Sequence, residues 1–209
     1  MPKKLIIGIV AGVVLLAGIG VGVFFFLNRG GSPAFEDVPK NHFYYKPVQW
    51  AEKNGIISGM FGDFFAPDEP CTRGQAMTFL WRASGSPEPS PDFRNPFPDI
   101  SPDMYCYDAV LWAAERRITR GTDEGGFYPD GAITRGQAMV FLYRAVGSPE
   151  VDDSKDLPFQ DVTSSDYYET AVRWAVGEKI TNGLAENAFL AHDPCTRAQM
   201  VMFLYRCFK

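Results

Sequence analysis

Three arginines lie where a positive charge does not help a helix. Each follows a threonine and precedes a glutamine by two positions, in Thr72-Arg73-Gly74-Gln75, Thr134-Arg135-Gly136-Gln137 and Thr196-Arg197-Ala198-Gln199. A threonine followed three residues later by glutamine is typical of a capping box, so each arginine falls in the first turn of a predicted helix. A cation there opposes the helix dipole by about 0.3–1 kcal/mol. We therefore expect an anionic group to compensate each arginine.

The chemistry open to these arginines is the binding of a carboxylate or a phosphate. A guanidinium holds either group through two parallel hydrogen bonds, and free backbone N–H groups at a helix N-terminus add to such a site. The competing interpretation is a salt bridge from each arginine to a repeated carboxylate, at Asp37, Asp99 or Asp161, or to an acidic neighbour of that residue. The residues alone leave both interpretations open.

The arginines belong to a repeat of 62 residues that needs no gap. Other positions matched at this period are Phe35/Phe97/Phe159, Trp50/Trp112/Trp174, Gly59/Gly121/Gly183 and Phe65/Phe127/Phe189. A fixed period with this many matches indicates three copies of one supersecondary unit, each too small to bury its apolar face alone. We place the copies at residues 35–96, 97–158 and 159–209.

Two helices are predicted in each copy, which gives an all-α, mainly helical fold. The first helices cover residues 44–54, 107–116 and 168–178, where apolar residues recur at helical spacing. The second helix follows each capping box and carries an apolar stripe, with Gly85 and Gly147 as stops in the first two copies. A loop of about 17 residues joins the two helices, long enough to need either an internal anchor or a binding role.

The other repeated residues are weaker candidates for a site. The three tryptophans lie one position before an inward-facing alanine, which suits packing between repeats as well as stacking on a sugar ring. The three glycines are interpreted as turn residues with positive φ, whose bare backbone would also let a glycan approach closely. The phenylalanines of the joining loops are assigned to packing.

The order of these motifs resembles the S-layer homology (SLH) repeat. The residues that carry the resemblance are Phe-x-Asp-Val/Ile, Ala/Pro-Val-x-Trp-Ala, Ile-x-x-Gly, Phe-x-Pro and Thr-Arg-Gly/Ala-Gln-x-x-x-Phe-Leu, in three copies over residues 35–209. The resemblance implies a pseudo-threefold, three-lobed domain that binds secondary polymers of the bacterial cell wall, often ones bearing a pyruvate ketal. It also implies that the ligand lies in grooves between neighbouring repeats, and it favours ligand binding by the three arginines. The repeated tryptophans and glycines stay as weaker carbohydrate-binding candidates.

This chain departs from the family pattern in two respects. The family usually has Thr-Arg-Ala-Glu, whereas all three copies here have glutamine in place of the glutamate. A glutamine that only caps the helix would serve almost as well, but one that fixes the arginine or a sugar hydroxyl would change the ligand preference. In the third copy, Ala191 and His192 replace the loop proline and aspartate, so we expect the site of Arg197 to be the weakest.

The N-terminal segment predicts a membrane anchor. Residues 5–27 hold no charged or strongly polar side chain, and at about 1.5 Å per residue they can cross a hydrocarbon core of about 30 Å. A signal peptide would have an apolar region of about 7–15 residues before a small-x-small cleavage site, whereas this run ends in Phe24-Phe25-Phe26-Leu27. We expect a cytosolic tail at 1–4, a transmembrane helix at 5–27 and a linker at 28–34, with the repeats outside facing the cell wall.

Composition excludes several function classes. Residues 32–209 carry 17 basic and 25 acidic residues, a formal charge of −8, which argues against a nucleic-acid partner. No repeated Ser/His/Asp set, Gly-rich phosphate loop or HExxH motif is present, so we expect no enzymatic activity and no cofactor. Neither His42 nor His192 has a Cys or His at metal-ligand spacing, so no metal site is expected.

The four cysteines, Cys71, Cys106, Cys195 and Cys207, each replace a residue that the repeat places in the core. An even count in an exported chain permits disulfides. A continuous last helix would separate Cys195 from Cys207 by about 18 Å, which excludes that bond and leaves two connectivities open.

Two functions follow as hypotheses. The first is a non-catalytic cell-wall-binding protein that tethers the membrane to an anionic secondary cell-wall polysaccharide, such as a pyruvylated one. The second is a membrane-anchored scaffold whose repeat surface binds another protein of the cell envelope.

Overall fold

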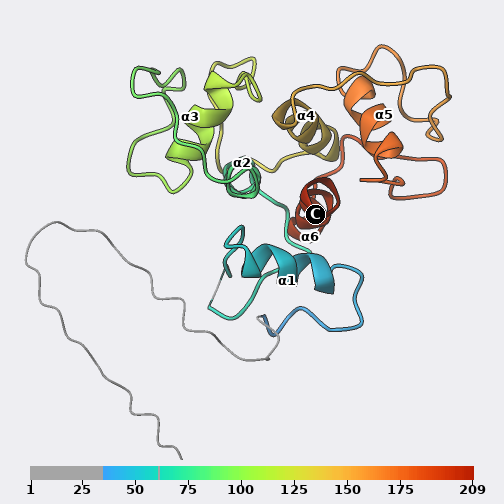
Figure 1. Cartoon of the computed structure of the whole chain (residues 1–209), viewed down its shortest axis with the longest axis horizontal. Coiled ribbons are helices and arrows are strands. Elements are labelled where there is room, and N and C mark those ends of the chain that lie inside the picture. Colours follow the sequence, from blue (N-terminus) through green and yellow to red (C-terminus); the bar gives the residue numbers. More distant parts are fainter. Residues whose placement is uncertain (1–34, 61) are drawn as a thin grey trace, which may run out of the picture. The chain divides into compact units, whose positions relative to one another are not determined.

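Six helices form the regular structure of residues 35–60 and 62–209, the part of the chain that this computed structural model describes (Figure 1). The first helices of the three copies are α1 (Tyr45–Lys53), α3 (Tyr107–Glu115) and α5 (Glu169–Gly177). The second helices are α2 (Arg73–Ala83), α4 (Arg135–Ala145) and α6 (Arg197–Phe208). The predicted all-helical fold is confirmed for these residues.

Each second helix begins at the predicted capping box. The Thr72 hydroxyl accepts a hydrogen bond from the Gln75 backbone N–H (3.2 Å), and the Gln75 side-chain oxygen accepts one from the Thr72 N–H (3.3 Å). The same two bonds start α4 and α6. Gly85 and Gly147 follow α2 and α4 with φ of +89° and +91°, which are the helix stops expected from the sequence.

The helices pack mainly across copies. α2, α4 and α6 contact one another at the centre of Figure 1, while α3 packs on α2, α5 on α4 and α1 on α6. The first helix of each copy therefore lies against the second helix of the preceding copy, and α1 closes the cycle on α6. The three lobes are thus shared between copies, which the repeat pattern did not predict.

Backbone hydrogen bonds join the three copies in a closed ring just before the central helices. The N–H of Cys71 donates to the C=O of Cys195 (2.8 Å), that of Cys195 to Ile133 (2.8 Å) and that of Ile133 to Cys71 (2.9 Å). All three residues are fully buried. Since every copy supplies one donor and one acceptor, the ring needs all three copies.

The four cysteines are free thiols. Cys71, Cys106 and Cys195 are buried, as the repeat pattern predicted, and Cys207 is half-buried. Burial raises the pKa of Cys71 to about 12 and that of Cys207 to about 11. Because the thiolate is the reactive form, burial disfavours reaction of these thiols in the folded protein.

The predicted transmembrane segment at 5–27 lies outside the described residues. Of the helices within residues 35–60 and 62–209, none combines the length and the apolar composition needed to cross a bilayer.

Candidate functional site

Each of the three arginines extends from the start of a central helix into the loop of the following copy. The Nε of Arg73 donates to the C=O of Phe127 (2.8 Å) and its Nη1 to the Oε1 of Gln137 (3.3 Å). The same bonds recur from Arg135 to Phe189 and Gln199 (3.0 and 3.2 Å) and from Arg197 to Phe65 and Gln75 (2.8 and 3.1 Å). The arginine of the third copy therefore bonds to the first copy, so these contacts also form a closed cycle of three.

Phenylalanine rings surround each guanidinium. The Cζ of Arg73 lies 4.9 Å from the ring centroid of Phe127 and 5.6 Å from that of Phe141. The arginine side chains are 1–5% exposed, and this burial lowers the pKa of each guanidinium. Arginine nonetheless stays protonated in proteins. The packing role assigned to the loop phenylalanines is confirmed, since Phe65, Phe127 and Phe189 are fully buried.

The backbone N–H groups at the start of the central helices are not free, which corrects the sequence argument. The Arg73 N–H donates to the C=O of Gly131 and the Gly74 N–H to that of Pro129, both at 2.8 Å. The first two backbone N–H groups of α4 and of α6 likewise donate to carbonyls of the following copy. The helix N-terminus therefore offers no spare donors here, and binding of an anion depends on the guanidinium.

The repeated aspartates hold the loops in place. Asp99 accepts from the backbone N–H groups of Phe127 (2.9 Å) and Tyr128 (2.6 Å), and Asp37 and Asp161 make the equivalent pairs of bonds. Burial alone would raise the pKa of Asp99, but these hydrogen bonds and nearby Arg73 outweigh it and leave that pKa below its usual value. Within the described residues no ion pair joins these aspartates to the arginines, so the salt-bridge alternative is wrong. Each aspartate instead fixes the backbone whose carbonyl accepts the arginine Nε.

Each guanidinium has one nitrogen, Nη2, that lacks a good hydrogen-bond partner among the described residues. In the described part of the chain, the Nη2 atoms of Arg73 and Arg135 are buried without a hydrogen-bond partner. The Nη2 of Arg197 makes one long bond, 3.4 Å, to the C=O of Ser58. A buried donor without a partner costs about 1–3 kcal/mol, and more when it is charged. An acceptor supplied by a ligand would recover that cost.

Two cavities between copies lie beside Arg73 and Arg197, and Arg135 lines neither of them. The first, here called the α2 groove, has a volume of about 390 Å³ and is lined among others by Gly59, Gln75, Arg82, Tyr105 and Arg197. The second, the α4 groove, has a volume of about 440 Å³ and is lined among others by Arg73, Arg120, Gly121, Gln137, Arg144 and Tyr167. Both combine arginines, amide groups and an exposed tyrosine, which suits a sugar that carries negative charge.

The repeated glycines are needed because other atoms come close to them. A Cβ at Gly121 would lie 2.7 Å from both the Gly126 carbonyl oxygen and the Phe97 ring, and one at Gly183 would lie 2.6 Å from the Phe159 ring. Gly121 and Gly183 have the predicted positive φ of +81° and +87°, but Gly59 does not. At Gly59 the predicted turn is wrong, and glycine is required by the close approach of the Gly62 carbonyl.

The tryptophans pack between helices and line neither groove. Trp50 and Trp174 contact Tyr205 and Tyr143, each at 5.6 Å between ring centroids, and Trp112 is buried. Their place favours packing over stacking on a sugar.

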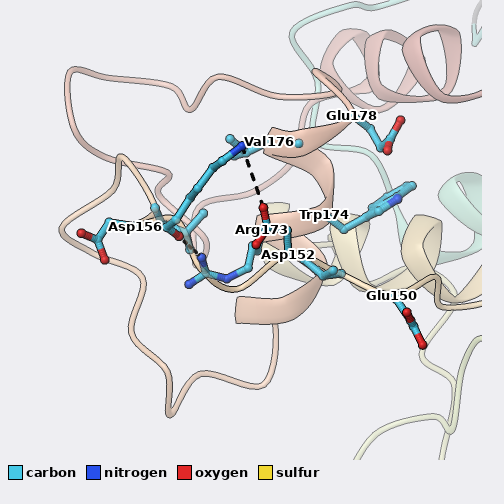
Figure 2. A pocket seen from close by; sticks show the side chains of 11 residues that line it. Glu150, Asp152, Asp156, Arg173, Trp174, Val176 and Glu178 are labelled. Carbon is cyan, nitrogen blue, oxygen red and sulfur yellow. Dashed lines mark hydrogen bonds and ion pairs between the residues drawn. The ribbon is translucent and has the colours of Figure 1, made fainter.

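Trp174 lines a separate cavity of about 380 Å³ between α5 and the connector that precedes it (Figure 2). There Arg173 forms an ion pair of 2.6 Å with Glu169 and donates to the backbone carbonyl of Lys155, while Lys155 pairs with Asp152. The two cations of this cavity, Lys155 and Arg173, therefore have carboxylate partners, unlike the arginines of the two grooves.

Sequence reasoning misses two further sets of groove residues. Tyr105 and Tyr167 are 61% and 65% exposed and share a repeat position with Phe43. Arg82 and Arg144 share another with Arg206, and each donates to an isoleucine carbonyl in the loop just after the preceding helix. Both sets recur at the 62-residue period outside the apolar stripe. A search for repeated residues without a packing role would have found them.

The irregular loop of the third copy is bonded to Arg135, from the second copy. The Arg135 Nε bonds the carbonyl of Phe189, and the Gly136 N–H bonds the carbonyl of Ala191 (2.8 Å). Arg197 instead reaches the regular loop of the first copy. The expectation that Arg197 marks the weakest site rested on pairing within one copy, and that pairing is wrong.

Three segments of the chain match the S-layer homology domain, at residues 34–77, 96–139 and 158–201. Together they cover more than half of the sequence. The chain belongs to the S-layer homology family. SLH domains bind the cell wall and are typical of bacterial surface proteins.

Similar proteins share only a part with this chain. A cell surface protein of Thermoanaerobacter kivui is 25% identical over 153 residues, which are 72% of this chain and 19% of that protein. An endoglucanase of Bacillus sp. (strain KSM-635) is 28% identical over 131 residues, 63% of this chain and 14% of the enzyme. A surface layer protein of Brevibacillus choshinensis is 25% identical over 104 residues, 49% of this chain and 9% of that protein. The chain thus spans less than a fifth of each relative. Some relatives, such as this endoglucanase, are named as enzymes, whereas the segments of this chain that match a family model are SLH repeats, which are non-catalytic.

Proposed function

We propose that this chain is a non-catalytic anchor that binds an anionic secondary cell-wall polymer in the grooves between its SLH repeats. Arg73, Arg135 and Arg197 are the residues that contact the negative charge. Residues 5–27 hold the N-terminal end in the membrane, with the N-terminus in the cytoplasm and the repeats facing the wall. The protein would then tether the membrane, or an assembly in it, to the wall.

The observation that carries this proposal is the arginine Nη2 that lacks a good partner beside a polar groove. The Nε and Nη1 nitrogens of Arg73 each donate to an acceptor inside the protein, so the unpartnered Nη2 indicates where an anion would bind. Exposed Tyr105 and Tyr167 flank the same grooves and offer ring faces to a sugar.

The glutamine of each capping box decides the charge of the site. Gln75 caps its own helix and also accepts the Nη1 of Arg197, and Gln137 does the same for Arg73. A glutamate there would keep both bonds but would neutralise the arginine. Since this chain has glutamine, each guanidinium keeps its full charge for a ligand.

This dual role provides a test that does not disturb the fold. Gln75→Glu and Gln137→Glu keep the capping box and favour the helix dipole, so the melting temperature should stay level or rise. A new negative charge a few ångströms from the bound anion should weaken binding by roughly tenfold per groove. Gln49→Glu, on the exposed face of α1, is the control for the change in net charge.

The measurement is sedimentation of the full-length chain, in a nonionic detergent, with wall sacculi of the source organism before and after the secondary polymer is stripped. Binding should need the polymer and should fall in Gln75→Glu and Gln137→Glu but not in Gln49→Glu. Equal binding by all four proteins would mean that the charge beside the arginines does not affect binding, and the proposal that these guanidinium groups contact the anion would be wrong. Undiminished binding to stripped sacculi would contradict the secondary polymer as the ligand, and no binding to either preparation would favour a protein partner and the scaffold hypothesis.

A further inference from the structure

The α4 groove carries one more positive charge than the α2 groove. Arg73, Arg120 and Arg144 line the α4 groove together with one carboxylate, Asp123. In the α2 groove two arginines, Arg82 and Arg197, stand against one carboxylate, Asp130. Across residues 35–60 and 62–209, no ion pair neutralises any of these five arginines.

The additional charge is Arg120, whose repeat counterparts Ser58 and Asn182 are neutral. Arg120 is exposed, so its charge has no packing role, whereas Arg144 is half-buried and is fixed by a 3.1 Å bond from its Nη1 to the Ile118 carbonyl. Burial lowers the pKa of Arg144, and the neighbouring positive charge of Arg120 lowers it further. The two cations therefore lie close enough to repel each other, and a bound anion would remove that repulsion.

Arg73 gives independent evidence for a missing acceptor in this groove. Its side chain is 5% exposed and its Nη2 has no partner in the described part of the chain. In the α2 groove the corresponding nitrogen of Arg197 already donates to the carbonyl of Ser58, the residue that replaces Arg120 there. The α4 groove thus has both the greater charge and the unused donor.

We propose that the α4 groove binds a doubly charged phosphate monoester of the wall glycan and that Arg120 sets this specificity. The α2 groove takes a singly charged group such as a carboxylate. This inference rests on the proposed function, in which the grooves hold an anionic polymer. A phosphate monoester carries a charge of about −1.5 to −2 at neutral pH and has three acceptor oxygens, enough for donors from three arginines.

Glucose 6-phosphate and glucuronate are suitable probes, because both are hexoses charged at C6 but differ in charge. The full-length chain in a nonionic detergent is titrated with each sugar, and the backbone amide signals of Gly121 and Gly59 report on the α4 and α2 grooves by NMR. Gly121 should respond to the phosphate at an at least tenfold lower concentration than to glucuronate. That preference should shrink at pH 5, because the second pKa of the phosphate is about 6 and the uronate remains a monoanion.

Two exchanged variants make the test specific. Arg120→Ser gives the second copy the residue that the first copy has, so it should fold normally and lose the tenfold preference at Gly121. Ser58→Arg should confer a phosphate preference on Gly59.

The outcomes separate this inference from the proposed function. If Arg120→Ser keeps the full phosphate preference, or if neither sugar moves the Gly121 signal, the inference is wrong, and the proposed function stands provided that Gln137→Glu still weakens binding to sacculi. If Gln75→Glu and Gln137→Glu bind sacculi like the unchanged protein, the proposed function fails and this inference fails with it.

Discussion

Replacement of Arg135 by alanine should destabilise the folded domain by about 2–4 kcal/mol. Its side chain is 1% exposed and donates to the Phe189 carbonyl (3.0 Å) and the Gln199 side chain (3.2 Å). Each hydrogen bond from a charged donor contributes about 1.5–3 kcal/mol, and the contact with the Phe189 ring about 0.5–2 kcal/mol. The cost of burying the charge and leaving its Nη2 unpaired offsets several kcal/mol of this gain.

Urea unfolding of the full-length chain, followed by tryptophan fluorescence, measures the effect. Arg135→Lys should recover only part of the loss, because an ammonium cannot reach both acceptors in one plane. Lys46→Ala, at an exposed position of α1, is the control and should change the free energy of unfolding by less than about 0.5 kcal/mol. If Arg135→Ala unfolds at the same urea concentration as Lys46→Ala, the bonds between copies add nothing to stability and the reasoning fails.

Three further predictions follow from the same contacts. Deletion of residues 159–209 removes the helix on which α1 packs and two of the three hydrogen bonds of the ring, so the remainder should melt without a sharp transition; an unaltered sharp transition would show independent copies. The pKa of Asp99 is lower in the folded protein than in the unfolded chain, where it is about 3.9. The ionised carboxylate therefore stabilises the fold at any pH above the unfolded pKa, and this stabilisation is lost as the pH falls through the folded pKa. Asp99→Asn should therefore lower the melting temperature at pH 7, and its difference from the unchanged protein should narrow steadily under acid; a constant difference would contradict the assignment. The buried thiols should react with DTNB only after the chain is unfolded in urea without reductant, and all four cysteines should then react. Reaction of only two thiols, or of none, would reveal disulfides.

Local structure could be predicted from this sequence because its signals are local. The capping boxes involve residues three positions apart, and the helix stops depend on the conformational freedom of Gly85 and Gly147. The buried phenylalanines and cysteines followed from the repeat, since a position that is apolar in every copy usually faces the core.

The partners of the arginines could not be predicted in the same way. In a repeat without gaps, the loop of the same copy and the loop of the next copy offer Arg73 the same residue types, Phe65 or Phe127, so the pattern fits both pairings. The choice depends on how the helices cross in space. For the same reason, the sequence did not show that the backbone N–H groups at the helix N-termini donate to carbonyls of the next copy.

The closed ring at Cys71, Ile133 and Cys195 sets a limit on how such a domain can evolve. An open solenoid gains or loses copies at its ends, because each unit contacts only its neighbours. Here every copy has both neighbours within the ring, so a fourth unit would find no vacant edge and a missing unit would leave two edges exposed. Gene duplication within the domain is therefore a poor route to new binding properties. Change has to come by substitution inside a fixed set of three, and since α2 contributes Arg73 to one groove and Gln75 to another, such substitutions can affect two grooves at once.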